Sequence, residues 1–242
     1  MGINHLTQAE AILQKNPKKN AYPLLRIDQG MVSECEVLGE SVRLLDSENG
    51  KYLYSVDTWE AFKVLYAPVR NRRGSHVSLV TDDRFTEAIA QHDGTLRLNA
   101  FHQLLAATNL PIQPIAGITF AKIDEAAIGW MLSVYQHPEL NHDFVVRRCA
   151  NAPSVLALYH GAPVGFIMSH CDAELGPVYV DPQFRASGLA TQLFARIMEQ
   201  FTARGARPVM FVSLYNTRSL KWLLRIGCTL ANDKVLWFWR DI

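Results

Sequence analysis

Long apolar segments are missing from this sequence. No stretch approaches the about 18 consecutive apolar residues that cross a membrane, and residues 1–14 lack the apolar core of a signal peptide. We therefore expect a cytoplasmic protein without a membrane partner.

Cysteine is scarce too, with four widely separated residues, no Cys-x-x-Cys pair and no histidine at zinc-finger spacing. The sequence therefore favours neither a disulfide framework nor a bound metal.

Net charge is also nearly absent. The chain has 24 Lys and Arg against 23 Asp and Glu, a formal charge of +1. No global attraction draws such a chain to nucleic acid, so we expect no nucleic-acid partner and any anion site must be local. A Gly-x-Gly-x-x-Gly motif after a first strand is missing as well, which disfavours a dinucleotide-binding unit. With 242 residues, 49% of them hydrophobic, the chain can build one large core or two small ones.

The most informative segment that is present lies at residues 178–190. Residues 178–180 predict a strand, Pro182 ends it, and apolar residues then recur at helical spacing from Leu189. The first N–H groups of such a helix have no intrahelical partner, and the helix dipole favours an anion beside them. Strand, turn and helix together therefore predict a site for a phosphate-bearing ligand.

The residues of this turn suit an anion. Gly188 and Ala190 leave the backbone accessible, and Arg185 adds a permanent positive charge. The spacing Arg185-x-x-Gly188-x-Ala190 resembles the acyl-CoA loop of the GNAT N-acetyltransferase superfamily. Taken alone, the same pattern would also fit an ordinary strand-to-helix turn with a solvated arginine.

A second signature follows one strand–helix unit downstream. Asn216-x-x-Ser219, with Gly227-Cys228 at the end of the helical pattern, resembles the family's Asn-x-x-Ala/Ser helix that ends in a Gly-Phe pair. Asn216 also suits a helix N-cap, and Gly227 suits the position where a helix stops. The resemblance implies acetyl-CoA as co-substrate, with the pantetheine arm on Asn216 and Ser219. The cofactor-binding residues it implies are Val178, Val180, Arg185, Ala186, Ser187, Gly188, Leu189, Ala190, Asn216 and Ser219.

The element pattern predicts an α/β (α+β) fold of two domains. Residues 114–242 form the GNAT domain, in which a mixed central sheet is flanked by helices. Its predicted elements are strands at 118–122, 154–159, 164–169, 175–180 and 208–214, helices from Asp124, at 188–204 and at 216–226, a helix or loop at 138–148, and a closing hairpin around Leu230 and 235–239.

Residues 1–110 predict a smaller α+β domain, joined to the rest by a proline-containing linker at 109–114. Its segment 16–25, Asn-Pro-Lys-Lys-Asn-Ala-Tyr-Pro-Leu-Leu, resembles the start of the N-terminal half, often a degenerate GNAT-like copy, of some bacterial GNAT and glycine-N-acyltransferase-like proteins. This half contains no Arg-x-x-Gly-x-Gly loop, so we expect it to shape the acceptor pocket rather than bind a second CoA. Its predicted elements are helices at 7–15, 59–65, 84–90 and 99–106 and strands at 32–37, 41–45, 52–56 and 76–81.

Acyl transfer to an amine needs a general base. Glu174, at the start of the predicted strand, is the first candidate because the family often carries its carboxylate there. His170 is the second, since its ordinary pKa of ~6.5 suits proton transfer, and Asp172 is the third. Simple alternation puts Glu174 on one face with Val178 and Val180, and a backbone N–H of that strand would stabilise the carbonyl oxygen.

One family residue is missing. The tyrosine commonly found seven residues after the helix-opening asparagine is Leu223 here, and Cys228 replaces the usual phenylalanine. A thiolate can leave unprotonated, since the pKa of a comparable thiol is ~8.5. The change weakens the enzymatic interpretation without excluding it.

We therefore expect an N-acetyltransferase that acts on a primary amine of a small molecule or amino acid. Two alternatives remain open: a glycine-type amino-acid N-acyltransferase using longer acyl groups, and an acyl-CoA-binding sensor without turnover. The aromatic segment 237–239 could pair across a homodimer or pack inward.

Overall fold

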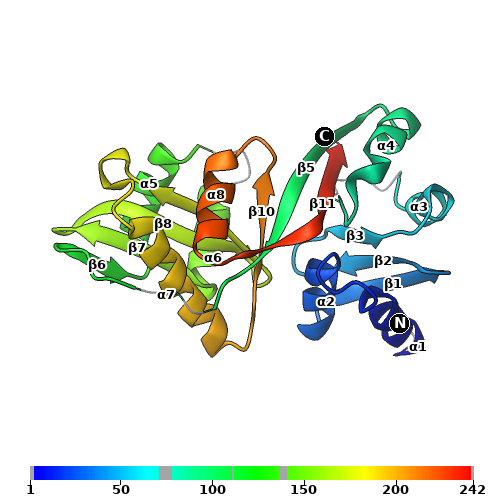
Figure 1. The fold of residues 1–242 in the computed structure, drawn as a ribbon, viewed down its shortest axis with the longest axis horizontal. Coiled ribbons are helices and arrows are strands. Elements are labelled where there is room, and N and C mark those ends of the chain that lie inside the picture. The colour runs from blue at the N-terminus through cyan, green and yellow to red at the C-terminus, as the bar shows by residue number, and fades with distance from the viewer. Residues whose placement is uncertain (1–2, 71–77, 109, 111, 137–140, 241–242) are drawn as a thin grey trace. The chain divides into compact units, whose positions relative to one another are not determined.

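The structure is a computed structural model that describes residues 3–70, 78–108, 110, 112–136 and 141–240. It is a mixed α/β fold, as predicted (Figure 1). The chain divides into two compact units. The first comprises Met1–Leu105, Phe211–Leu224 and Thr229–Ile242, and the second comprises Ala106–Met210 and Arg225–Cys228.

The first unit contains a sheet in the order β1-β2-β3-β4-β11-β5. β3 and β4 run parallel and pair through three consecutive residues of each strand, and the other described pairings in this unit are antiparallel. Its elements are α1 (Ile3–Leu13), α2 (Ala21–Asp28), β1 (Val32–Leu38), β2 (Ser41–Asp46), β3 (Tyr52–Ser55), α3 (Trp59–Tyr66), β4 (Ser78–Val80), η1 (Asp83–Phe85), α4 (Thr86–His92), β5 (Leu96–Leu105) and β11 (Thr229–Arg240).

The last strand supplies part of the first unit's core. Leu236 and Phe238 of β11 are 0% and 1% exposed and pack in one apolar cluster with Tyr54, Phe62 and Val80. Arg240, near the end of β11, contacts Asp93 at 2.5 Å. Trp237 and Phe238 of the aromatic segment at 237–239 are thus buried within the chain, and the homodimer stays a prediction.

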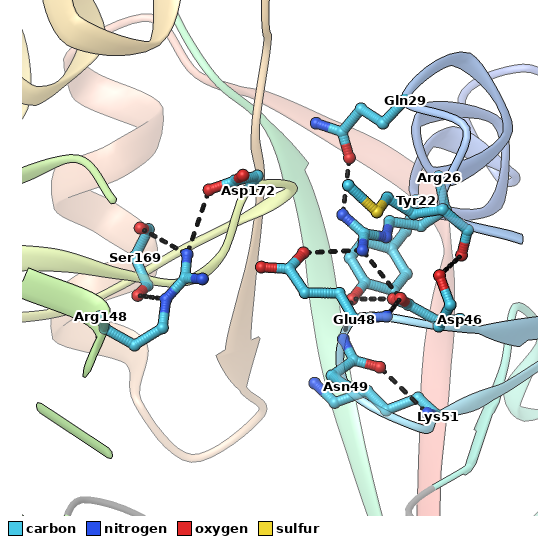
Figure 2. A network of polar contacts seen from close by, with 12 residues as sticks. Tyr22, Arg26, Gln29, Asp46, Glu48, Asn49, Lys51, Arg148, Ser169 and Asp172 are labelled. Carbon is cyan, nitrogen blue, oxygen red and sulfur yellow. Dashed lines mark hydrogen bonds and ion pairs between the residues drawn. The ribbon is translucent and has the colours of Figure 1, made fainter. Parts of the chain in front are cut away.

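A buried ionic network joins α2 to the β2–β3 turn (Figure 2). The fully buried guanidinium of Arg26 contacts Asp46 at 2.8 Å and Glu48 at 2.7 Å, and donates to the side chain of Gln29 at 2.6 Å. Because a buried charge without partners is costly, this network fixes the position of α2.

The second unit contains strands in the order β10-β9-β8-β7-β6. The pairs among β6, β7, β8 and β9 are antiparallel, whereas β9 and β10 are parallel. Its elements are β6 (Ile118–Ala121), α5 (Glu125–Val134), α6 (His142–Asn151), β7 (Ser154–Tyr159), β8 (Ala162–Cys171), β9 (Glu174–Val180), η2 (Pro182–Phe184) and α7 (Leu189–Ala203). β10 (Val209–Ser213) and α8 (Thr217–Arg225) span the division between the units.

Helices cover both faces of the second unit's sheet. Phe166 of β8 belongs to the apolar cluster under α5 and α6, and its ring stacks on Tyr179 of β9 with centroids 5.8 Å apart. The preceding residue, Gly165, faces α7: a Cβ built there would lie 3.2 Å from Leu193. Neighbouring strand residues point to opposite faces, so α7 lies opposite α5 and α6.

The same series of elements occurs twice along the chain. The series from α1 to β5 consists of two helices, three strands, a helix, a strand, a helix and a strand. The same order runs from α5 to β11. In both series the third strand and the strand after the next helix are parallel neighbours.

Most predicted elements of residues 114–242 are confirmed, including the helix opened by Asp124, whose side chain accepts from the Ala127 N–H at 2.9 Å. The helix predicted at 99–106 is wrong, because these residues lie in β5 and pair along β11. The closing hairpin is also wrong, since residues 229–240 form one strand with a register shift between Leu230 and Lys234.

Some predictions fall partly outside the described residues. These include parts of the predicted strand at 76–81, the linker at 109–114 and the segment at 138–148. The two predicted domains, 1–110 and 114–242, remain a prediction. The compact units divide the chain differently, because β11 pairs with β4 and β5.

Candidate functional site

The loop between β9 and α7 is held in shape by its own side chains. Asp181 caps η2 by accepting from the Gln183 N–H at 2.9 Å. The Ser187 hydroxyl donates to the Phe184 carbonyl at 2.7 Å. Arg185 is exposed and its Nε donates to the Val180 carbonyl at 3.3 Å, which keeps the guanidinium at the loop.

The backbone of this loop is left-handed at two positions. Gly188, the N-cap residue of α7, has φ +89°, where glycine is favoured. Ala186 has φ +64°, a conformation that is rare for a residue with a Cβ. A Cβ at Gly188 would meet nothing within 4 Å, so the backbone angle, and not crowding, favours glycine there.

The N–H groups of this loop are open. Within the part of the chain that the structure describes, the backbone N–H groups of Ala186, Ser187, Gly188 and Ala190 have no hydrogen-bond partner, and that of Leu189 has only a 3.4 Å contact with the Ser187 hydroxyl. Residues 185–188 are exposed. Adjacent open N–H groups at a helix N-terminus suit a phosphate or pyrophosphate.

Two further N–H groups are available on β9. The Asp181 N–H donates to Val164 of β8 at 2.8 Å, and N–H directions alternate along a strand. The N–H groups of Val180 and Val178 therefore point away from β8. The described pairing between β9 and β10 is limited to Val209 and Glu174, so it does not extend to these two residues.

A bulge in β9 separates this part of the strand from Glu174. Ile167 of β8 pairs with Val178, but Ser169, two residues later, pairs with Leu175, three residues earlier. The extra residue falls at Gly176–Pro177. Because directly paired residues share a face, Leu175 lies on the face of Val178. The simple alternation that placed Glu174 with Val178 and Val180 is therefore interrupted between them.

The candidate bases lie on either side of the β8–β9 turn. Glu174 is 8% exposed and begins β9. His170 is partly buried in β8, and its ring lies 6.2 Å from that of Phe144 on α6. Its Cδ2 would lie 3.9 Å from a Cβ built at Gly176. Asp172, the third candidate, is in the turn itself and is paired with Arg148 at 3.2 Å (Figure 2). It is also paired with Arg204 at 3.9 Å.

The second signature forms the predicted helix start. Asn216 accepts from the Ser219 N–H at 3.1 Å and so caps α8, and Gly227, just beyond the helix, has φ +93°. Leu223 is buried at 4% exposure. Asn216 and Ser219 fall in the segment grouped with the first unit, whereas the 185–190 loop is in the second. Their contact with one shared ligand therefore stays a prediction.

Cys228 occupies the position of the family's phenylalanine and is 5% exposed. Burial is the main reason why the pKa of its thiol lies above the ordinary value. A protonated, buried thiol behaves as a small apolar side chain, in keeping with a change confined to the core.

Comparison with known proteins identifies the family. The profile of the Acetyltransferase (GNAT) family matches residues 120–228. This segment includes the 185–190 loop and the helix opened by Asn216. Residues 120–228 are a GNAT acetyltransferase domain.

An uncharacterized N-acetyltransferase of Methanocaldococcus jannaschii resembles part of this GNAT domain. The two sequences are 32% identical over 79 residues, which cover 28% of this chain and 35% of the relative's length. The match thus spans about a third of that protein.

Solved structures resemble most or all of the chain at low identity. A Drosophila protein aligns with 100% of this chain and 97% of its own, with TM-score 0.65 and 12% identity. A tandem GNAT protein from the clavulanic acid biosynthesis pathway aligns with 83% of this chain and 78% of its own, with TM-score 0.50 and 15% identity. At these identities the likeness concerns the fold.

Near the candidate bases of the GNAT domain lies one polar group that sequence reasoning missed, the guanidinium of Arg148. Arg148 on α6 donates to Ser169 and Asp172, and no motif marks it.

Among the described residues, no group of three or more His, Cys, Asp or Glu could hold a metal ion. No described helix is long and apolar enough to cross a membrane.

Proposed function

We propose that this protein transfers an acetyl group from acetyl-CoA to a primary amine of a small molecule or amino acid. The observation that carries the proposal is the open row of N–H groups at 186–190, placed within a GNAT domain at the start of α7. Such a row fits the pyrophosphate of CoA. Arg185 beside it adds a positive charge that a nucleotide phosphate would meet.

The N–H groups of Val178 and Val180 would hold the rest of the co-substrate. Both point away from β8, and the described pairing of β10 with β9 reaches neither of them. One can bind the pantetheine arm, and the other can donate to the thioester carbonyl as negative charge develops on its oxygen. Asn216 and Ser219 would add contacts to the arm.

Glu174 and His170 are the groups proposed to take the proton from the attacking amine. Both flank the same turn, and both are partly or largely shielded from water. The neutral amine attacks the thioester carbon, the base accepts the amine proton directly or through a water, and the C–S bond breaks. The thiolate leaves without a donor at position 223, where Leu223 carries no acid.

The first half of the chain is proposed to be a degenerate second copy of the fold. The repeated element order and the likeness to a tandem GNAT structure support this proposal. In this half, the segment that corresponds to the 185–190 loop is short. β3 ends at Ser55, and Thr58 already caps α3 by accepting from the Ala61 N–H. β3 and β4 also pair over three residues, where β9 and β10 pair at one. The described segment between β3 and α3 therefore offers no comparable N–H row.

Calorimetric titration tests the co-substrate. Acetyl-CoA should bind saturably, CoA should bind similarly, and ADP and NAD should bind weakly or not at all. Arg185→Glu places a negative charge beside the phosphates and should weaken acetyl-CoA binding by about tenfold or more.

The matched control is Arg207→Glu, the same charge reversal at an exposed arginine beyond the other end of α7. It should bind acetyl-CoA like the wild type. Equal loss in both variants would indicate a general electrostatic effect, and no binding by the folded wild type would refute the proposal.

Amine screening then separates the remaining alternatives. Turnover with acetyl-CoA and small amines supports the acetyltransferase. Turnover only with longer acyl groups and glycine-like acceptors would indicate the amino-acid N-acyltransferase. Tight binding without turnover for any acceptor would indicate the sensor, for which the buried Leu223 in place of an acid is the supporting observation.

A further inference from the structure

The β8–β9 turn lies between the two candidate bases, and a side chain from α6 contacts it at two residues. His170 precedes the turn, Glu174 follows it, and Asp172 and Ala173 form it. Both bulges of this strand pair lie close by, one near His170 and one at Gly176–Pro177. Regular strand pairing is interrupted at these positions, so other contacts must fix the turn.

Arg148 makes those contacts from the last turn of α6 (Figure 2). Its Nε donates to the Ser169 carbonyl at 3.3 Å, and its Nη2 donates to the Ser169 hydroxyl at 3.3 Å and to the Asp172 carboxylate at 3.2 Å. One guanidinium thus holds the residue before His170 and the first residue of the turn. Its side chain is 17% exposed.

The partners of Arg148 are themselves anchored. Ser169 is fully buried, and its hydroxyl also contacts the Pro153 carbonyl at 3.3 Å. Asp172 lies 3.9 Å from Arg204 at the end of α7. On the far side of the turn, the Ala173 carbonyl accepts from the Val209 N–H of β10 at 2.9 Å. The turn is therefore tied to α6, to α7 and to β10.

We infer that Arg148, acting through Ser169 and Asp172, is the positioning residue that orients His170 and Glu174 for proton transfer. This inference rests on the proposed function. Arginine suits the role because its planar fork can donate to a carbonyl, a hydroxyl and a carboxylate at once, which a lysine ammonium cannot do in the same geometry. Asp172, which is paired, then serves as an anchor of the turn and not as the base.

The test compares Arg148→Met, Arg148→Lys and the matched control Arg147→Met. Arg147 is the preceding residue on the same helix; its side chain is exposed and makes no hydrogen bond or ion pair with any described residue. Misplacing a catalytic group by about 1 Å can cost about 100-fold in rate. Arg148→Met should therefore lower kcat about 10- to 100-fold while the KM and calorimetric Kd for acetyl-CoA stay within twofold.

Arg148→Lys should recover only part of the lost kcat, and Arg147→Met should match the wild type. A purely structural role for Arg148 would weaken acetyl-CoA binding and thermal stability together with kcat. A wild-type kcat in Arg148→Met would overturn the inference.

Hydrogen exchange gives a readout that does not depend on turnover. Amides of residues 169–175 should exchange faster in Arg148→Met than in the wild type, with helix α7 unchanged. If Arg148→Met fails to fold, Asp172→Ala takes its place in this test. It removes the contacts of a half-exposed carboxylate with Arg148 and Arg204, leaves those of Arg148 with Ser169, and should give the same local increase in exchange. If the wild type proves inactive, the proposed function fails, while faster exchange in the variant still supports the positioning of the turn by Arg148. Unchanged exchange in a folded variant overturns that positioning.

Discussion

The conformation of Ala186 places an energetic cost inside the candidate phosphate loop. Its φ of +64° is unusual for a residue with a Cβ, and a left-handed conformation costs about 1–2 kcal/mol for such residues. Strain of this kind persists where surrounding contacts enforce it, and it is frequent at ligand sites. Here the Ser187–Phe184 and Arg185–Val180 hydrogen bonds hold the loop on both sides.

If only the backbone of Ala186 serves the ligand, Ala186→Gly should bind acetyl-CoA like the wild type. It should also raise the free energy of unfolding by about 0.5 kcal/mol, because relief of strain slightly exceeds the added chain entropy. Ala186→Pro removes the N–H and fixes φ near −65°, so binding should fall at least about tenfold. Urea unfolding and calorimetry measure both effects.

His160→Gly is the matched control, since His160 also has a positive φ, +47°, in the β7–β8 turn. It should change stability in the same direction as Ala186→Gly without altering binding. Wild-type binding by Ala186→Pro would show that this N–H does not contact the ligand.

At the level of elements, predictions succeeded where the signal is local. Asp124 and Asn216 cap their helices as expected, because capping depends on a side chain and an N–H three residues away. The helix predicted at 99–106 failed because β5 takes its structure from β11, more than 120 residues later in sequence. Apolar residues such as Leu96, Leu98 and Ala100 alternate there and pack on the first unit's core.

The candidate site shows the same division. The strand, turn and helix around Arg185 and Gly188 were predictable, since proline, glycine and helical spacing mark them. The sheet face on which Glu174 lies could not be predicted, because the bulge at Gly176–Pro177 depends on pairing with β8. Arg148 carries no sequence signal, since its partners lie over 20 residues away.

Alanine substitutions at two glycines, Gly176 and Gly129, test the bulge in β9. Gly176 has a positive φ, and Gly129 is helical. Gly176 has φ +135°, so Gly176→Ala should lower the free energy of unfolding by about 1–2 kcal/mol. Its new Cβ would also lie 3.9 Å from the His170 ring, an ordinary contact. The loss would therefore come from the backbone and not from a clash.

Gly129 provides the contrast within the same unit. It lies inside α5, is exposed, and has nothing within 4 Å of an added Cβ. Gly129→Ala should raise the free energy of unfolding by about 0.5–1 kcal/mol. Chemical denaturation of both variants checks the pair; an unchanged stability of Gly176→Ala would mean that the bulge tolerates a side chain.

For the whole molecule, the position of β11 matters most. The GNAT profile ends at residue 228, and β11 begins at Thr229. This strand pairs with β4 and β5, and its Leu236 and Phe238 lie in the core cluster of the first unit. A fragment of residues 114–242 would therefore carry a strand whose described partners belong to residues 1–110.

We expect neither the 1–110 nor the 114–242 fragment to fold cooperatively alone. The first lacks a central strand of its sheet, and the second exposes side chains such as Leu236 and Phe238, each worth about 1.5–3 kcal/mol when buried. Circular dichroism during thermal unfolding should show no sharp transition for either fragment. Co-expression of the two fragments should yield a complex that unfolds in a single sharp transition. A full chain with a short Gly-Ser insertion after Gln113 controls for the break itself and should unfold like the wild type. A cooperative transition and acetyl-CoA binding by the 114–242 fragment alone would show that the pairing of β11 with β4 and β5 is dispensable to the GNAT domain and that the predicted domain boundary is the correct one.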